Sequence, residues 1–486
     1  MNLSKSRYTC AYQCKKLLWL LDNLPEEKEE TNTSVLDNGT NVGIVAKDLL
    51  GDHIDIEFNK DLNQMINDTK KALLNDSVVV TEASFNYDGN FCSVDLLKKD
   101  HDNYEIYEVK SSTEVHDIYL EDASYQYYVL KSLNLNVTKV YIVYINNEYV
   151  RHGNLELDKL FNIYDNTTYA ISRYNEIKEE IKDIKQYMLN KEEPKENISI
   201  NCFKPYECPY FKYCTRNLPK PNVFDIKGMR NDTKIKLYNN NIITYKELLN
   251  SDINDKYKEV VDFTLNNLEP KINKTKIKEF LNTLKEPLYF LDFETYQQSI
   301  PLYDGIKPYE QIPFQYSLHY YNNNKLCHKE FLAQDSIDPR RSLAESLVKD
   351  IPKDVCVLAY NMSFEKNVIK NLANTYQDLS NHLLNIYDNI KDLMIPFYKR
   401  DYYTKEMSGS YSIKYVLPAL FKDDPTLDYH NLNDVHNGSE AMNAYQSLSN
   451  LNKEEKEKLR NNLLLYCKLD TYAMVKIYEK LKEIEK

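Results

Sequence analysis

The alternation of apolar and polar residues in the first third of the chain predicts a small α/β unit. A helical period runs from about residue 4 to residue 21, and a second helix is expected near residues 42–50. Three β-rich runs follow, and the turn-forming segments NYDGN and DHDN between them suit antiparallel hairpins. A longer helix is expected over about 118–133. The strands of this unit are expected at 77–85, 91–99, 104–112 and 138–146.

The rest of the chain predicts a helical connector and a second α/β unit. A charged helical pattern covers about 165–197, and short helices are expected over about 244–284. EPLYFLDFETY and DVCVLAYN are typical of buried strands, the second leads into a helix at about 363–373, and residues 453–484 contain a long helix. The predicted boundaries are 1–222 for the first domain, 223–284 for the connector and 285–486 for the second domain.

Composition limits the class of protein. With 486 residues the chain exceeds one ordinary core, since a domain holds roughly 150 residues. The balance of 42% apolar and 28% charged residues is that of a globular protein. No apolar run approaches the roughly 20 residues that cross a bilayer, and the N-terminal MNLSKSRYTCAYQCKKLLWLL mixes polar residues through what would be a signal segment. We therefore expect a cytoplasmic protein with no membrane partner.

The net charge of −12 argues against a uniformly basic nucleic-acid-binding surface. Nucleases concentrate acidic residues in metal sites and basic residues in one groove, however, so the total charge does not exclude them. The 42 tyrosines can be interpreted as base-stacking platforms. Because the chain has only 9 glycines and is rich in Asn, Lys and Ile, coding bias explains the tyrosines better.

Candidate acidic ligands lie on three elements of the second domain. Asp292 and Glu294 are two apart on a predicted strand, which places both carboxylates on one face. Glu365 stands at the start of a helix, and Tyr466 and Asp470 lie four apart on one face of the C-terminal helix. Two Mg²⁺ or Mn²⁺ ions about 4 Å apart, the arrangement used for phosphodiester hydrolysis, need such hard oxygen ligands. Asp292 would bridge both ions, and Glu294 and Asp470 would complete their shells. Glu365 would act from the helix side and Tyr466 would orient the attacking water.

Three motifs give this set a family resemblance. The segments FLDFET, NMSFE and YCKLD resemble the motifs of the DnaQ-like, RNase H-fold 3′-5′ exonucleases, across the whole second domain. The spacing of Tyr466 and Asp470 resembles the subclass with tyrosine in the third motif, the DEDDy type. That family usually has Asp where this chain has Glu365, and Asp392 is the alternative. Lys414, in GSYSIKYVLPAL, is either a contact for a substrate phosphate or a lysine on the exposed face of a helix start.

A second candidate site lies in the first domain. Asp95 in SVDLLKK and Glu108 with Lys110 in YEVKSS are expected on adjacent strands. Two carboxylates can hold Mg²⁺ and the ammonium can offset charge on phosphate, while a cross-strand ion pair is the alternative. The order of these residues resembles the PD-(D/E)XK nuclease core, and Gln126 stands where the RecB-like branch has its glutamine. Further candidates for this site are Tyr128, Glu82 and His53.

Cysteines suggest a cofactor beside this second site. Three cysteines are clustered in the sequence, Cys202, Cys208 and Cys214, and Cys14 precedes the predicted core. Because the sequence shows no export signal, we expect thiols or metal ligands and not disulfides. The iron-sulfur RecB-like nucleases take one cysteine from before the core and three from after it, and this arrangement resembles theirs, which implies a 4Fe-4S cluster. Zn²⁺ is the alternative, although structural zinc sites typically use local cysteine pairs. Cys10 is the alternative ligand to Cys14. A cluster here would clasp the first helix to the end of the domain.

The segments SKSRYTCAYQCKKLLWL, KPYECPYFKYC and PLYFLDFETY together resemble an uncharacterised bacterial family, a domain of unknown function, that joins these two nuclease domains. The resemblance implies a metal-dependent nuclease with two sites, acting on DNA in repair, recombination or defence. One alternative is an iron-sulfur nucleic-acid-binding module in which one or both sites are inactive. Another is an exonuclease that trims RNA. Nucleic acid is the expected partner in each case.

Overall fold

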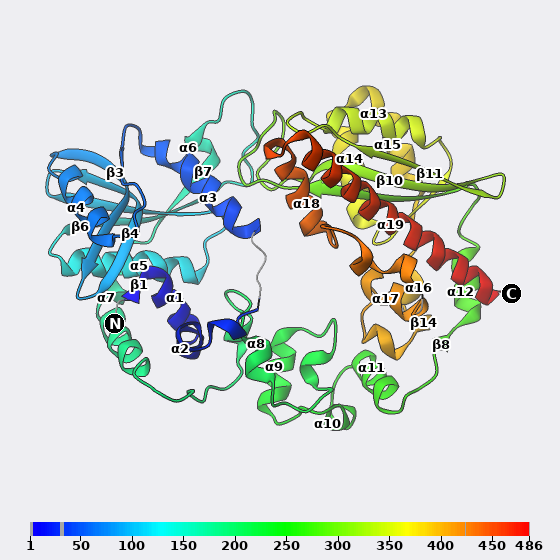
Figure 1. Cartoon of the computed structure of the whole chain (residues 1–486), viewed down its shortest axis with the longest axis horizontal. Coiled ribbons are helices and arrows are strands. Elements are labelled where there is room, and N and C mark those ends of the chain that lie inside the picture. The colour runs from blue at the N-terminus through cyan, green and yellow to red at the C-terminus, as the bar shows by residue number, and fades with distance from the viewer. Residues whose placement is uncertain (1–2, 30–33, 423, 486) are drawn as a thin grey trace. The chain divides into compact units, whose positions relative to one another are not determined.

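The computed structural model forms two compact units, each with its own β-sheet (Figure 1). The N-terminal unit comprises Met1–Leu218 with Gln298–Glu310, and the C-terminal unit comprises Pro219–Gln297 with Gln311–Lys486. The protein is therefore a mixed α/β protein, which confirms that part of the sequence prediction. No helix among the described residues is long and apolar enough to span a bilayer. The structure describes residues 3–29, 34–422 and 424–485.

A seven-stranded sheet forms the centre of the N-terminal unit. Its order is β2-β3-β4-β5-β6-β7, and β1 pairs with β4. Strands β3, β4 and β5 form the antiparallel meander predicted from the two turn segments, and β6 lies parallel to β5. The strands are β1 Leu3–Ser4, β2 Ile54–Asp55, β3 Ser77–Tyr87, β4 Asn90–Asp100, β5 Asn103–Lys110, β6 Asn136–Ile145 and β7 Phe161–Asp165.

Helix α5, Asp117–Ser132, connects the parallel strands β5 and β6. It is buried along most of its length because it packs against the sheet on one side and against α7 on the other (Figure 1). This burial fixes the side chains that α5 directs toward β4 and β5. The other helices of this unit, α1 and α2 apart, are α3 Ser34–Ala46, α4 Leu62–Ala72, α6 Leu157–Leu160, α7 Thr167–Tyr187 and α8 Phe211–Thr215.

The continuous first helix expected from the sequence is divided at Cys14. Helix α1 spans Lys5–Gln13 and helix α2 spans Lys15–Asn23, while Cys14 between them is extended, with φ −164° and ψ 118°. The break turns α2 so that its apolar residues pack against the cysteine-rich end of the unit. The indole N–H of Trp19 on α2 donates to the carbonyl of Asn190 at 2.9 Å. The helical spacing of apolar residues cannot predict this break, because the residues of α1 and of α2 both show that spacing.

The C-terminal unit contains a five-stranded sheet of order β11-β10-β9-β12-β13. Strands β9, β10 and β11 are antiparallel neighbours, whereas β12 pairs parallel with β9 and β13 pairs parallel with β12. In chain order the strands therefore lie 3-2-1-4-5 across the sheet. They are β9 Leu288–Tyr296, β10 Ile312–Asn322, β11 Lys325–Leu332, β12 Cys356–Ala359 and β13 Ile390–Asp392.

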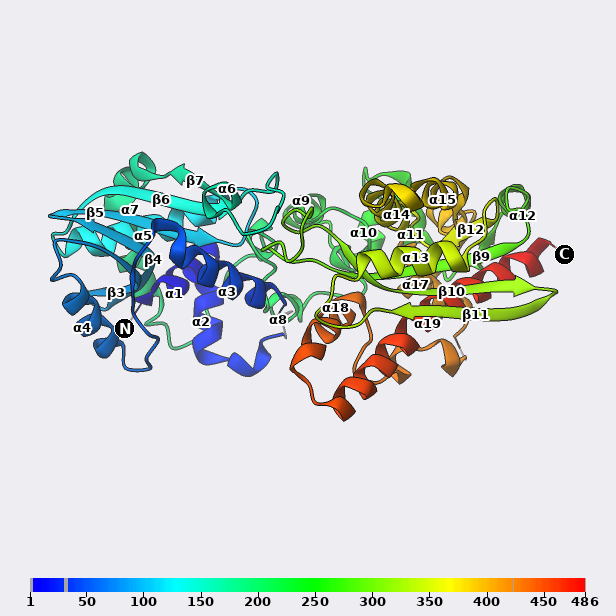
Figure 2. The same cartoon turned by 90° about the horizontal axis from the view of Figure 1, so that it is seen from above.

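The two faces of this sheet are covered by different helices. Tyr289, Leu291 and Phe293 of β9 pack with α13, α14 and α15, whereas Leu288 and Phe290 pack with α19 (Figure 2). Because side chains alternate along a strand, the acidic residues at positions 292 and 294 lie on the α19 face. These helices are α13 Arg340–Asp350, α14 Ser363–Thr375, α15 Gln377–Asn389 and α19 Lys453–Glu485.

The region expected as a separate connector is part of the C-terminal unit. Val223, Leu248, Val260 and Ile277 are buried in the same hydrophobic cluster as Phe290 of β9, so these short helices share its core. The remaining elements of the unit are α9 Asn231–Asn239, α10 Tyr245–Leu249, α11 Asp255–Leu265, β8 Lys271–Ile272, α12 Lys274–Leu281, α16 Ile395–Tyr398, β14 Tyr402–Tyr403, α17 Ile413–Leu420 and α18 Gly438–Ser447.

The segment Gln298–Glu310, which follows β9, belongs to the N-terminal unit. The backbone N–H of Arg151 donates to the Ile306 carbonyl at 3.1 Å, and the Gly305 N–H donates back to Arg151 at 2.8 Å. The Tyr309 hydroxyl donates to the Ser111 carbonyl at 2.6 Å. The predicted boundary at residue 222 therefore does not include one part of the N-terminal unit, because a long-range pairing attaches it.

Candidate active sites and cysteine cluster

The C-terminal unit brings the predicted carboxylates of β9 and α19 together. Ligand atoms of Asp292, Glu294 and Cys467 all lie within 4.8 Å of one another. Asp470 accepts a 2.6 Å hydrogen bond from the Tyr429 hydroxyl. Cys467 and Tyr429 were not predicted, although Cys467 lies three residues before Asp470, and helical spacing could have placed it on this face. Nothing local to Tyr429 indicates its role.

Tyr466, which was predicted to orient water, is buried near Asp470, Glu294 and Asp292. Its ring centroid is 6.1 Å from that of Tyr429. Burial raises the pKa of Asp470 to about 6, while hydrogen bonds from Tyr429 and Tyr466 and the charge of Lys414 oppose the rise. Burial and the neighbouring acids raise the pKa of Tyr466 far above its ordinary range, so its hydroxyl keeps its proton and donates it in hydrogen bonds.

Glu365 lies in the first turn of α14, within electrostatic range of Asp292 and Glu294. Glu365 is only 2% exposed, and its Oε2 has no hydrogen-bond partner among the described atoms. Burial raises the pKa of Glu365 to about 8. Its charge in turn contributes, after burial and nearer acids, to the raised pKa of Asp292 and of Glu294. The structure therefore brings Glu365 within the field of the other predicted ligands.

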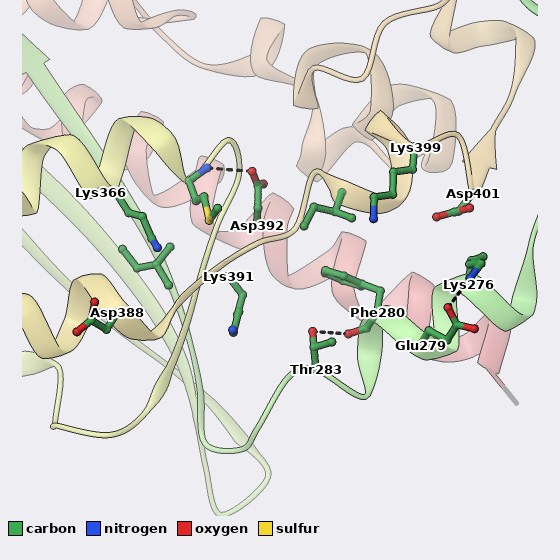
Figure 3. Close-up of a pocket in the computed structure, with 13 residues that line it drawn as sticks. Lys276, Glu279, Phe280, Thr283, Lys366, Asp388, Lys391, Asp392, Lys399 and Asp401 are labelled. Atoms are coloured by element: carbon green, nitrogen blue, oxygen red, sulfur yellow. Dashed lines mark hydrogen bonds and ion pairs between the residues drawn. The ribbon is translucent and has the colours of Figure 1, made fainter. Parts of the chain in front are cut away.

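Asp392, the alternative to Glu365, uses its carboxylate on the backbone instead. Its Oδ1 accepts from the N–H groups of Asn361 at 3.0 Å and Met394 at 2.9 Å, and its Oδ2 accepts from Met362 at 3.2 Å. Figure 3 shows Asp392 on the wall of another pocket, of about 790 Å³, with Lys366, Lys391 and Lys399. Asp392 thus holds the segment that begins α14 and thereby positions Glu365.

The donor set of the C-terminal site fits a divalent cation. Burial and the charge of Asp470 raise the pKa of Asp292, and burial with the same charge raises that of Glu294. A bound cation relieves such repulsion between buried carboxylates. Several carboxylate oxygens, one of them buried without a partner on Glu365, are the ligands that Mg²⁺ and Mn²⁺ prefer.

A cleft of about 850 Å³ in the C-terminal unit shares residues with this site. Lys414 and Tyr429 line it, and its walls otherwise combine apolar and polar groups. The Lys414 charge lowers the pKa of both Glu294 and Asp470 against the effect of burial, so the ammonium lies close to the carboxylates. Lys414 is exposed on α17 and is therefore accessible to a ligand in the cleft. Its other lining residues are Leu417, Pro418, Phe421, Lys422, Asp424, Pro425, Leu427, Asp428, His436 and Asn437.

The N-terminal unit also brings its four predicted residues together. The Asp95 carboxylate accepts from the Val109 backbone N–H at 2.6 Å, where the ladder between β4 and β5 ends. The Lys110 ammonium donates to Glu108 Oε1 at 2.6 Å. The Gln126 amide, from α5, donates to the other oxygen of Glu108. The strands and the crossover helix thus converge on Glu108.

Two further charged residues complete this site. The Lys5 ammonium, at the start of α1, donates to Glu108 Oε1 at 2.7 Å and lies 3.8 Å from Asp122 Oδ2. Asp122 on α5 also forms an ion pair with Lys110. Asp122 precedes Gln126 by one helical turn, so helical spacing could have identified it. Lys5 could not be identified, because it is 103 residues from Glu108.

In the N-terminal site two lysines form ion pairs with the buried acids. Although burial opposes the effect, the ammonium groups of Lys110 and Lys5 hold the pKa of Glu108 well below its ordinary value. Both Glu108 oxygens already accept hydrogen bonds. Burial and the Glu108 charge raise the pKa of Asp95 to about 8. A cation at this site would therefore compete with two lysines for Glu108.

The three further candidates for this site differ in position. Glu82 lies on β3 between Thr81 and Ala83, which pair with Leu96 and Val94 on either side of Asp95. It has a positive φ of 57°, which is strained for a residue with a side chain. Burial raises the pKa of Glu82, and the Glu108 charge adds to the rise. His53 instead lies 3.2 Å from the Gly51 carbonyl. The Tyr128 ring packs on Tyr174, with centroids 5.5 Å apart. Of these three candidates, only Glu82 therefore lies near Asp95 and Glu108.

The four predicted cysteines converge around α2 and α8. Burial raises the pKa of Cys208 to about 12, and the charges of Cys202, Cys214 and Cys14 each add to the rise. The raised pKa of Cys10 has burial as its cause, with Arg7 and Lys28 opposing, and no other thiol contributes. All five cysteines pack on one apolar cluster. Electrostatic interactions between thiols link Cys208 to Cys202, Cys214 and Cys14 but do not include Cys10.

The sulfur spacing bears on what this group can hold. Zn–S bonds of about 2.3 Å in a tetrahedron place sulfurs about 3.8 Å apart. Among the described residues, no three of these cysteine sulfurs lie within 4.8 Å of one another. Four thiolates are the ligand set of a structural zinc ion and also of an iron-sulfur cluster.

Comparison with known proteins finds uncharacterised relatives. The chain is 27% identical over 343 residues to "Uncharacterized protein MG366" of Mycoplasma genitalium, covering 62% of this chain and 50% of that protein. It is 26% identical over 260 residues to "Uncharacterized protein UU173" of Ureaplasma parvum, covering 49% of this chain and 37% of that protein. The chain therefore spans half or less of the length of these relatives. No solved structure matches the chain.

The family comparison concerns the sheet of the C-terminal unit. Residues 289–412 match the model described as "Domain of unknown function (DUF2779)". The matched region begins on β9 with Asp292 and Glu294 and includes Glu365, but ends before α19. The chain is thus similar, over this region, to a family of proteins that share a domain of unknown function.

Proposed function

We propose that the protein is a metal-dependent nuclease whose C-terminal unit is a 3′-5′ exonuclease. The observation that carries the proposal is the approach of the Asp292 and Glu294 ligand atoms within 4.8 Å of one another, in the electrostatic field of Asp470 on α19 and Glu365 on α14. The 3-2-1-4-5 strand order, with three antiparallel strands and two parallel ones, supports an RNase H-like domain. The DUF2779 match is to a domain of unknown function, so it supports neither this activity nor another one.

The chain's own residues have separable roles in this reaction. Asp292, Glu294, Glu365 and Asp470 would hold one or two Mg²⁺ or Mn²⁺ ions, which supply a polarised phosphate and an activated water. Tyr466 remains protonated and would orient that water through its hydroxyl. Lys414 lines the adjoining cleft and would contact the phosphate of a bound strand.

The N-terminal unit supports a second nucleolytic site. A meander that supplies Asp95, Glu108 and Lys110, followed by a crossover helix that supplies Gln126, is consistent with a RecB-like PD-(D/E)XK domain. One observation favours an alternative, in which this unit only binds nucleic acid. Glu108 is already neutralised by Lys5 and Lys110, so its affinity for a cation is expected to be low until substrate displaces a lysine.

We also propose that Cys14, Cys202, Cys208 and Cys214 hold a 4Fe-4S cluster, with Zn²⁺ as the alternative. Because Cys14 lies at the break between α1 and α2, the cluster would fix that break to the end of the unit. It would thereby keep Lys5, at the start of α1, near Glu108. Its role in this proposal is structural.

A substrate panel tests the proposal. Anaerobically purified protein is incubated with labelled single-stranded DNA, duplex DNA and RNA in Mg²⁺ or Mn²⁺, beside Asp292→Ala and Glu365→Gln. Glu457→Gln, which removes an exposed acid from α19, is the matched control. We expect stepwise 3′-5′ shortening of DNA by wild type and by the control only. Cleavage of RNA alone would favour RNA trimming, and intact substrates throughout would reject the nuclease.

A further inference from the structure

A pocket of about 460 Å³ opens beside the Lys110 site in the N-terminal unit. Three tyrosines line it from three different segments, Tyr12 on α1, Tyr119 on α5 and Tyr206 in the loop between two of the clustered cysteines. The pocket adjoins the site, because the Lys110 ammonium lies 5.3 Å from the centroid of the Tyr119 ring, which lines the pocket. The other lining residues are His116, Asp117, Ile118, Asn201, Lys204 and Pro205.

The aromatic side chains of this pocket are available to a ligand. Tyr206 is 57% exposed and Tyr12 is 43% exposed. The rings of His116 and Tyr119 meet edge to face, with centroids 5.2 Å apart. Burial and the nearby Tyr119 raise the pKa of Tyr206 to about 12, so its phenol stays neutral and its ring remains a stacking surface.

The loop that carries Tyr206 is held in place by its neighbours. The Gln13 amide donates to the carbonyls of Asn201 at 2.7 Å and Tyr206 at 2.8 Å, and Asn201 donates back to Gln13 at 3.0 Å. The Cys208 N–H donates to the Cys202 carbonyl at 2.9 Å, which closes the loop. The ring of Tyr206 is therefore presented by a braced segment.

From this geometry we infer that the pocket binds an unpaired nucleobase of the strand whose phosphate lies at Lys110, so that the N-terminal site takes single-stranded ends. Aromatic rings stack on any base whose face is exposed, and a base inside a duplex has both faces covered by its neighbours. Lys204 at the rim supplies a cation for the same strand's backbone. This inference rests on the proposed nucleic-acid function of the N-terminal unit.

The test measures stacking directly and does not require cleavage. A short single-stranded oligodeoxynucleotide with a fluorescent 2-aminopurine at its end is titrated, in EDTA, with full-length protein carrying Asp292→Ala. We expect quenching of the base on binding, about tenfold weaker binding with Tyr206→Ala, and near wild-type binding with Tyr206→Phe. Tyr164→Ala is the matched control, because Tyr164 is 45% exposed on β7 of the same unit and outside the pocket.

Each outcome decides the inference. Quenching that survives Tyr206→Ala and the parallel variant Tyr12→Ala would overturn it, as would equal affinity for a blunt duplex and for the single strand. Tyr12→Ala also replaces Tyr206→Ala if the latter lowers the melting temperature. Ring-dependent quenching without any cleavage in Mg²⁺ would retain the pocket and reject the nuclease. Cleavage lost in Lys110→Ala but insensitive to both tyrosine variants would retain the nuclease and reject the pocket.

Discussion

Replacing Glu365 by glutamine is expected to stabilise the protein without metal and to reduce the stabilisation that metal provides. The Glu365 carboxylate is buried, and its Oε2 has no partner among the described atoms. Glutamine has nearly the same shape, carries no charge and can donate to the neighbouring acids. Leaving a buried polar group unsatisfied costs about 1 to 3 kcal/mol. In EDTA, Glu365→Gln should therefore raise the unfolding free energy by about that amount.

Metal should narrow the difference in stability between the variant and wild type if Glu365 is a ligand. A cation at 100 times its Kd stabilises the native state by about 2.7 kcal/mol, and a tenfold weaker Kd reduces that gain to about 1.4 kcal/mol. Urea unfolding in EDTA and in Mg²⁺ measures both quantities for wild type, Glu365→Gln and the control Glu457→Gln. If Mg²⁺ stabilised wild type and Glu365→Gln equally, or if the variant were less stable in EDTA, Glu365 would not be the ligand described here.

Three further predictions test other residues. Tyr466→Phe should lower kcat by roughly 10²-fold with little change in KM or in metal affinity, since it removes only a hydroxyl that orients water; single-turnover kinetics measures this. Cys14→Ser should abolish the visible absorption of the anaerobic protein, whereas Cys10→Ser should keep it; stoichiometric zinc in a colourless protein would contradict the cluster. Burial lowers the pKa of His319 to about 3 and of His328 to about 4, so both disfavour the native state once pH falls below the unfolded value near 6.5. Between pH 7 and 5 wild type should lose about 1 kcal/mol or more of stability relative to a His319→Gln, His328→Gln variant, and parallel urea midpoints would refute this.

Local periodicity predicted the parts of the sites that lie within one element. Asp292 and Glu294 share a face because strands alternate, and Tyr466 and Asp470 share a face because a helix repeats about every four residues. The meander that carries Asp95 and Glu108 followed from its turn segments in the same way. These relations need no knowledge of distant packing.

Contacts between distant segments could not be predicted. Lys5 reaches Glu108 only because α1 docks beside α5, and no local pattern distinguishes Lys5 from other lysines at helix starts. The break at Cys14 depends on what α2 packs against. Asp392 looked like a ligand in the sequence, but its carboxylate is used by three backbone N–H groups that only the folded chain brings to it.

We propose that the site around Asp292 removes nucleotides from 3′ ends. The most direct measurement follows product release from single-stranded DNA labelled at its 5′ end, in Mg²⁺, with Lys110→Ala protein to silence the N-terminal site. We expect a ladder of products shortened stepwise from the 3′ end, which disappears when Asp292→Ala is added. An unchanged ladder in the Asp292→Ala, Lys110→Ala protein would contradict it.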